Sequence, residues 1–160
     1  MTSQNKIKNH EEAREITKKL KTLGKAIGFT NGCFDILHLG HIRYLREAKR
    51  KCDFLVVGVN SDSSLKRLNK GKNRPFNRQD DRIEVLSALE CVDLVTLFEE
   101  DTPEDLIKLI TPDLLFKGAD WKEDEIVGSG YVKAKGGKVC VIPYMEGYST
   151  TNLIERIVRS

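Results

Sequence analysis

The chain has 160 residues, of which 39% are hydrophobic and 32% charged, and its formal net charge is +3. This length suits one domain with a real core. No apolar run approaches the roughly 20 residues that a membrane-spanning helix needs. Residues 1–10 are polar and lack the apolar centre of a secretory signal peptide, so we expect a cytoplasmic protein.

The four cysteines are widely spaced and contain no CxxC pair: Cys33, Cys52, Cys91 and Cys140. This spacing indicates neither a zinc site nor a disulfide framework, so reduced thiols are expected.

The first expected element is an amphipathic helix at the N-terminus. Asn9 and Glu12 have the spacing of a capping box, and Gly24 is typical of a helix end. Between them lies an apolar stripe of Ala13, Ile16, Leu20 and Leu23. We therefore predict an N-terminal docking helix within residues 1–24, followed by the main domain over residues 25–160.

The main domain alternates short apolar runs with helical patterns. The runs predict strands at Ala26–Phe29, Phe54–Val59, Leu94–Phe98, Leu114–Phe116 and Val139–Ile142. Helical stripes follow as Ile42/Leu45/Ala48, Ile83/Leu86/Leu89, Leu106/Ile107/Ile110 and Leu153/Ile154/Ile157/Val158. This alternation predicts an α/β fold, an open parallel sheet with helices on both faces.

An HxGH tetrapeptide, His38 to His41, stands between the first strand with its loop and the next helical pattern. A helix N-terminus offers unpaired backbone N–H groups and partial positive charge, so it binds phosphate. His38 and His41, one turn apart, would face the same anion, and Gly40 lacks a side chain that would keep a phosphate away. Ligands of such sheets bind beyond the carboxyl ends of the strands, so segments 60–62, 117–121 and 146–151 are expected near this loop.

Seven cations lie between positions 66 and 82, where Asp80 and Asp81 are the only acids: Lys66, Arg67, Lys70, Lys72, Arg74, Arg78 and Arg82. The run is either a solvated face or a clamp for polyphosphate. Phe76 is its single aromatic residue, which argues against nucleic-acid binding. Residues 69–77, rich in Lys, Asn, Gly and Pro, form the segment most expected to be flexible.

Other nucleotide-binding signatures are missing. There is no GxxxxGK[ST] loop, and Gly128-Ser129-Gly130 is neither continued nor placed as a dinucleotide fingerprint. The HLGH sequence is similar to the HIGH signature of class I tRNA synthetases, but no second signature of that class appears.

Three segments resemble, in order and spacing, the signatures of the HxGH nucleotidylyltransferase family: Thr30–His41, the GxDW segment Gly118–Trp121, and Glu146–Thr151. The resemblance runs from about Ala26 to the end and implies a Rossmann-like fold of the nucleotidylyltransferase type. Within the family, the chain is most similar to stand-alone adenylyltransferases that form ADP-heptose for lipopolysaccharide cores. It departs from the RTxGISTT signature of glycerol-phosphate cytidylyltransferases at Tyr144, Met145 and Tyr148, which favours ATP over CTP.

The resemblance implies that D-glycero-β-D-manno-heptose 1-phosphate attacks the α-phosphorus of ATP, giving ADP-heptose and pyrophosphate. His38, His41 and Lys72 would be catalytic, and Lys70, Lys72 and Arg74 would bind the substrate phosphate. The nucleotide would contact Thr30, Asn31, Gly32, Cys33, Phe34, His38, Gly40, His41, Gly118, Asp120, Trp121, Tyr148, Ser149, Thr150 and Thr151. Mg²⁺ would enter with ATP, held by phosphate oxygens and water, with no protein metal site.

Three further side chains are not expected to contact a ligand. Asp35 would organise its loop through backbone hydrogen bonds, Arg82 would pair with an acid, and His10 would lie on the surface.

The expected partners are ATP, a sugar 1-phosphate and a separate sugar kinase acting earlier; the resemblance also allows a homodimer. Neither nucleic acid nor membrane is expected to bind. Two alternatives stay open, a cytidylyltransferase acting on a polyol or alcohol phosphate and a non-catalytic nucleotide-sensing module. The protonation of the two histidines and the anomeric form of the sugar stay open too.

Overall fold

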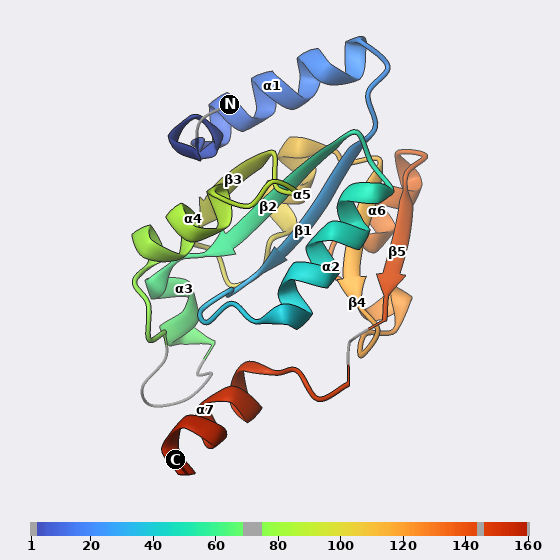
Figure 1. The fold of residues 1–160 in the computed structure, drawn as a ribbon. Coiled ribbons are helices and arrows are strands. Elements are labelled where there is room, and N and C mark those ends of the chain that lie inside the picture. Colours follow the sequence, from blue (N-terminus) through green and yellow to red (C-terminus); the bar gives the residue numbers. More distant parts are fainter. Residues whose placement is uncertain (1–2, 69–74, 144–145, 160) are drawn as a thin grey trace.

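A computed structural model describes residues 3–68, 75–143 and 146–159. These residues form one parallel sheet of β1 (Ile27–Gly32), β2 (Phe54–Asn60), β3 (Leu94–Phe98), β4 (Leu114–Gly118) and β5 (Lys138–Ile142). The strand order is β3-β2-β1-β4-β5 (Figure 1). The first strand therefore lies in the middle of the sheet, and the direction of winding reverses between β1 and β4. The predicted open parallel sheet is confirmed, and the expected loops follow its carboxyl ends.

Helices cover both faces of the sheet, as predicted. One face packs against α1 (His10–Thr22), α5 (Glu104–Ile110) and α6 (Ser129–Ala134), and the other against α2 (Leu39–Arg50) and α4 (Gln79–Ser87). The remaining elements are α3 (Asp62–Arg67), α7 (Thr150–Arg159) and the short 3₁₀ turns η1 (Ser3–Lys6) and η2 (Glu123–Glu125). Two apolar clusters, one on each side of the sheet, form the core. No helix in the described ranges is long and apolar enough to cross a membrane.

The first strand extends past its apolar run. Its register with β2 continues from Ile27↔Phe54 to Gly32↔Val59, so Thr30 to Gly32 are strand residues rather than loop. The pairing with β2 explains the extra length, because a central strand continues as long as its neighbour supplies hydrogen-bond partners.

The N-terminal segment belongs to the same packed body as the sheet. The capping box of Asn9 and Glu12 is present, and Ala13 and Thr17 of α1 are buried against the core. Ahead of α1, the Lys8 amide donates to the Val95 carbonyl along the edge of β3. His10, expected on the surface, is instead half-buried, with Nε2 2.6 Å from the Leu97 carbonyl oxygen. Because a carbonyl only accepts, this nitrogen carries a proton.

The last helix differs from the others. It begins where the sequence predicts, but none of its described residues is buried. Ile157 and Val158 of its apolar stripe are 63% and 79% exposed. Figure 1 shows α7 beyond the carboxyl edge of the sheet, at the bottom of the view and outside the two helical layers. The predicted apolar stripe is therefore not part of the core, because the helix is displaced from both faces of the sheet.

Candidate active site

The two histidines of the HxGH segment lie together at the start of α2. His38 is the N-cap residue of this helix and His41 lies in its first turn. Their ring centroids are 3.9 Å apart, with the planes inclined by 31°. The prediction that one turn of helix brings both imidazoles to one place is confirmed.

Each histidine ring accepts a hydrogen bond from the backbone. Nδ1 of His38 accepts from the Gly40 amide at 3.1 Å, and Nδ1 of His41 accepts from the His38 amide at 3.3 Å. An accepting Nδ1 carries no proton, so each ring is a neutral tautomer with its proton on Nε2. The sequence predicted unpaired amides at this helix end, but the imidazoles themselves occupy two of them. Phosphate would therefore meet the Nε2–H groups as well as the remaining amides.

Burial keeps both rings neutral. Desolvation, together with a smaller effect of the neighbouring His38, lowers the pKa of His41 to about 4. Desolvation also lowers the pKa of His38 from its ordinary value. At neutral pH the pair therefore offers two N–H donors without net charge.

Gly40 has a second reason to be glycine. A Cβ at this position would lie 2.9 Å from the His38 ring and 3.2 Å from Cβ of Tyr148. Only a residue without a side chain lets His38 fold back to cap the helix. The same contact places Tyr148, from the third signature, over the HxGH turn, as expected for segment 146–151.

The strand leading to the histidines contributes a further contact. The Thr30 hydroxyl is buried and lies 2.9 Å from the Tyr44 hydroxyl of α2, which joins β1 to the HxGH helix. Asn31 is half-buried, and its Oδ1 atom has no hydrogen-bond partner among the described residues. Tyr44 was not predicted as a site residue, because a single tyrosine in a helical pattern belongs to no sequence motif.

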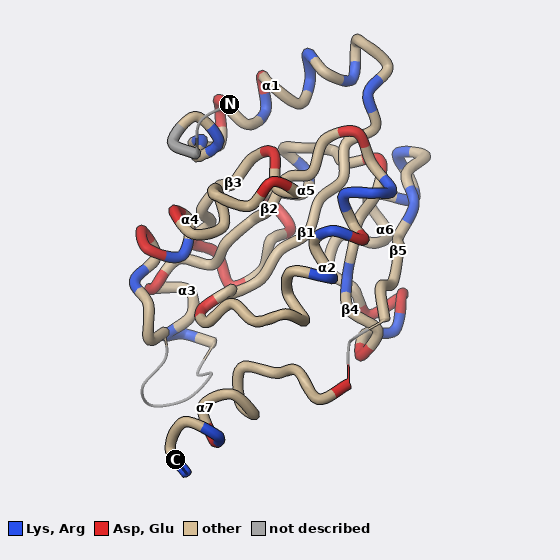
Figure 2. The backbone as a smooth tube through the Cα atoms, viewed as in Figure 1, with Lys and Arg blue, Asp and Glu red and all other residues tan. Residues whose placement is uncertain are grey.

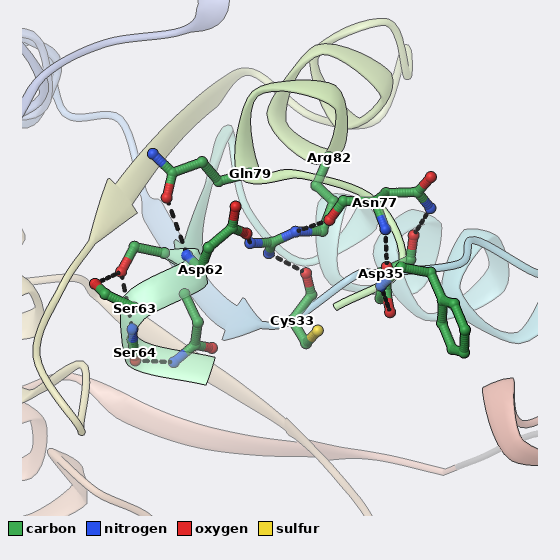
Figure 3. Close-up of polar contacts among 11 residues, drawn as sticks. Cys33, Asp35, Asp62, Ser63, Ser64, Asn77, Gln79 and Arg82 are labelled. Atoms are coloured by element: carbon green, nitrogen blue, oxygen red, sulfur yellow. Dashed lines mark hydrogen bonds and ion pairs between the residues drawn. The ribbon is translucent and has the colours of Figure 1, made fainter. Parts of the chain in front are cut away.

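Arg82 joins three segments around the site (Figure 3). Its buried guanidinium donates to the Cys33 carbonyl at 2.7 Å, the Asp62 carboxylate at 2.8 Å and the Asn77 carbonyl at 3.2 Å. The expectation that Arg82 pairs with an acid is confirmed. Its link between Asp62 and Cys33 also shows that the loop after β2 lies beside the loop after β1. Gln79 supports this link by accepting from the Asp62 amide at 2.9 Å.

Asp35 acts as a backbone anchor, as expected, but it reaches a different loop. Its two carboxylate oxygens accept from the amides of Phe76 at 2.9 Å and Asn77 at 2.8 Å, and the Asn77 side-chain amide donates to the Asp35 carbonyl. The chain leaving segment 69–74 is thereby tied to the loop that leads to His38. Asn77 was not predicted, because only the tertiary structure brings these two loops together.

The described cations of the basic run lie on α3 and around the start of α4 (Figure 2), and their contacts differ. Arg67 pairs with Asp101 at 2.7 Å and also donates to the Glu99 carbonyl, whereas Lys66 and Arg78 are exposed. The predicted substrate-binding residues Lys70, Lys72 and Arg74 lie outside the described residues. Tyr144 and Met145, two of the positions that distinguish the third signature, lie outside them too.

The GxDW segment follows β4, the neighbour of β1. Gly118 is buried at the end of this strand, while Asp120 and Trp121 are exposed, with the Lys117 ammonium 5.7 Å from the centre of the indole ring. Trp121 is therefore not a core residue, and the Lys117 ammonium lies at cation–π distance from its ring. Its role toward a nucleotide stays a prediction.

Ser149 is placed to begin α7. Its hydroxyl accepts from the Asn152 amide at 3.0 Å, a helix-capping contact. Thr150 is half-buried and Thr151 exposed in the first turn. These groups retain the capacity to bind phosphate, because capping uses one lone pair of one hydroxyl.

Two predicted nucleotide contacts are more enclosed. Phe34 is 7% exposed, with its ring centroid 5.5 Å from that of His41. Cys33 is half-buried, and no disulfide links any of the four cysteines, all of which the structure describes.

Within the described ranges, no three His, Cys, Asp or Glu residues gather as a metal site.

Comparisons of this sequence with a family model and with known proteins agree on one family. The family model described as cytidylyltransferase-like matches residues 29–156. The bifunctional protein HldE of Nitratiruptor sp. is 55% identical over 94% of this chain, and that of Granulibacter bethesdensis is 52% identical over 91%. The chain spans about a third of the length of these relatives, 32% and 30% respectively.

Solved structures show the same architecture. A lipopolysaccharide core biosynthesis protein from Thermoplasma volcanium has a TM-score of 0.64 and 32% identity, covering 79% of this chain and all of that one. A pantoate-beta-alanine ligase from Francisella tularensis, with a TM-score of 0.60 and 18% identity, covers 96% of this chain and 79% of its own and shares the fold. The prediction of a Rossmann-like nucleotidyltransferase fold is confirmed. By the family model, the sequence relatives and the fold together, this chain belongs to the cytidylyltransferase-like family of nucleotidyltransferases.

Proposed function

We propose that this protein transfers AMP from ATP to D-glycero-β-D-manno-heptose 1-phosphate, giving ADP-heptose and pyrophosphate. The observation that carries the chemistry is the pair of neutral imidazoles, 3.9 Å apart, each with Nδ1 engaged by the backbone and Nε2–H left as a donor. Such preorganised donors stabilise charge that develops on a phosphate without needing to reorient.

The reaction requires alignment more than proton transfer. An oxygen of the sugar phosphate forms a bond to the α-phosphorus of ATP, and the bond from that phosphorus to the bridging oxygen breaks. Pyrophosphate leaves with the electron pair. Since the second pKa of a phosphate monoester is about 6, the nucleophile is already mostly dianionic at neutral pH and needs no strong base.

The residues at the sheet edge would divide this work. His38 and His41 would donate to oxygens of the α- and β-phosphates, and Ser149 and Thr150 would bind the rest of the triphosphate at the start of α7. Lys72, with Lys70 and Arg74, would hold the sugar phosphate or the departing pyrophosphate. ATP would enter as its magnesium complex, the metal being bound by phosphate oxygens and water.

The choice of substrate rests on sequence similarity. The chain resembles ADP-heptose-forming adenylyltransferases, and its relatives include bifunctional HldE proteins and a lipopolysaccharide core biosynthesis protein. As part of this proposal, a sugar kinase acting earlier would supply the sugar 1-phosphate. The use of ATP and the absence of disulfides support the cytoplasm as the compartment. A homodimer stays a prediction.

The decisive experiment is a matrix of four nucleoside triphosphates against a panel of sugar, polyol and alcohol phosphates, followed by pyrophosphate release. ATP with heptose 1-phosphate should give the highest kcat/KM, by a large factor over CTP. Faster turnover of CTP with any acceptor would contradict the substrate assignment and favour the cytidylyltransferase alternative. Tight nucleotide binding with no turnover of any pair would favour the sensing module.

A further inference from the structure

Phe34 has an unusual backbone conformation for a bulky residue. Its φ angle is 49°, in the left-handed region, and only one other described non-glycine residue, Thr111, has a positive φ. Large side chains avoid this region because Cβ crowds the backbone. Such a conformation persists only where the surroundings fix it, and it often marks a functional position.

Both neighbours of Phe34 are held by buried polar contacts. On one side, the Cys33 carbonyl accepts from Nη1 of Arg82 at 2.7 Å. On the other, the Asp35 carboxylate, 5% exposed, accepts from two backbone amides, those of Phe76 and Asn77. The peptide unit before Phe34 therefore cannot rotate without breaking a charge-assisted hydrogen bond, and the residue after it is held through its carboxylate.

Arg82 is unsuited to touching substrate itself. Its side chain is 0% exposed, and its three donors are directed to Cys33, Asp62 and Asn77. To reach a phosphate, it would have to abandon the Asp62 carboxylate, whose side chain is only 28% exposed. Leaving a partly buried charge without its partner is costly.

The ring of Phe34 extends this support to the histidines. It lies 5.5 Å from the His41 ring, inclined by 57°, and His41 in turn lies against His38. A Cβ at Gly32 would come within 3.1 Å of the Phe34 ring, so the strand end is shaped to admit it. We propose that Arg82 and Asp35 are positioning residues that lock Phe34 in its left-handed conformation, so that its ring fixes His41 for catalysis.

A double-mutant cycle tests this coupling, which rests on the proposed nucleotidyl transfer. In Asp35→Asn the side chain keeps the shape of Asp but has only one oxygen, so it can accept a hydrogen bond from only one of the two backbone amides. Asp35→Asn should lower kcat by about 10-fold in the wild-type background and by less than about 2-fold in a His41→Ala background, since coupled residues are not additive. Release of radiolabelled pyrophosphate measures the slow turnover of these variants. Equal losses in both backgrounds, or no loss in either, would overturn the proposal.

Asp93→Asn is the matched control. Asp93 also accepts from a backbone amide, that of Leu55 at 2.7 Å, and from a cation, Lys49 at 2.7 Å, but it lies at the opposite end of the sheet. It should lower the melting temperature to a similar degree while leaving kcat at 25 °C unchanged. A matching loss of kcat in Asp93→Asn would show that the effect of Asp35→Asn is general destabilisation, and would overturn the positioning role.

Phe34→Leu keeps the proposal testable if Asp35→Asn does not fold. It retains bulk but removes the aromatic ring, so it should give the same loss of kcat and the same lack of additivity with His41→Ala. An unchanged kcat in folded Phe34→Leu would overturn the proposal.

Proton NMR of the His41 ring separates this inference from the proposed reaction. Asp35→Asn should shift the His41 Hε1 and Hδ2 resonances as Phe34 moves, while the His10 resonances stay in place. If wild-type protein turned over no substrate pair, the proposed function would fail, and these shifts would decide the positioning role alone. Unmoved His41 resonances would then overturn it.

Discussion

Two helices begin at the carboxyl edge of the sheet with a segment predicted to bind phosphate, and the two are held very differently. The start of α2 is fixed from several sides: Leu45 and Ala48 are buried below it, and both histidine rings are bonded to the backbone. The start of α7 has the Ser149 cap, and no described residue of this helix is buried. One helix is part of the core, and the other lies outside it.

The proposed phosphate site would therefore combine a helix start that is fixed by packing with one that is not. Groups on α2 are in place before substrate arrives, which suits donors that must meet transition-state charge. Groups on α7 gain little from packing, so more of their ordering is left to the ligand, at a cost in binding entropy. We therefore expect substitutions at the start of α2 to act mainly on kcat, and those in α7 on affinity.

The largest contrast should appear in stability. Leu45→Ala removes a fully buried side chain of α2 and should lower the free energy of unfolding by about 2–5 kcal/mol. Val158→Ala, at a position 79% exposed in α7, should change it by less than about 0.5 kcal/mol. Urea unfolding followed by circular dichroism measures both. A similar loss in Val158→Ala would mean that α7 packs on something in solution.

The histidines should give the largest effect on rate. His38→Ala and His41→Ala should each lower kcat by roughly 100-fold or more, because each removes a donor to transition-state charge. Steady-state pyrophosphate release, with circular dichroism to show that the fold is intact, provides the measurement. A folded variant with near-normal kcat would remove that histidine from the mechanism.

The basic run should show a smaller, uneven effect. If Lys72 binds phosphate chiefly in the transition state, Lys72→Ala should lower kcat by about 10-fold and weaken substrate affinity, and Lys72→Arg should restore only part of it. Lys66→Ala, exposed on α3, is the matched control and should change kcat by less than about 2-fold. Equal, small effects at low ionic strength would show that the run is a solvated face.

The last predicted effect is a pH dependence of stability. Folded His41 has a pKa of about 4, lowered by burial, whereas an unfolded histidine titrates near 6.5. Between these values the unfolded state binds more protons, so His41 lowers stability progressively as pH falls from about 6.5 to 4. The melting temperature of wild type should therefore fall more between pH 7 and 5 than that of His41→Gln. Parallel curves for the two proteins would show that His41 is not buried as a neutral ring.

Local sequence patterns were sufficient for much of the architecture. Apolar runs predicted the five strands, because a strand covered on both faces must be apolar along its length. The Asn9 and Glu12 capping box and the Ser149 cap were readable, since these contacts span three residues. The meeting of His38 and His41 followed from helical geometry for the same reason.

Contacts between distant segments needed the tertiary structure. Asp35 bonds residues 41 and 42 positions away, and Arg82 bonds Cys33 49 positions away, separations at which no sequence period exists. The tautomer of the histidines depended on which backbone amides the rings reach after folding. The sequence of α7 predicted its amphipathic stripe, but only the fold decided that the stripe lies away from the core. Sequence determines which side chains a helix gathers on one face, whereas the position of the helix relative to the sheet decides whether that face is buried.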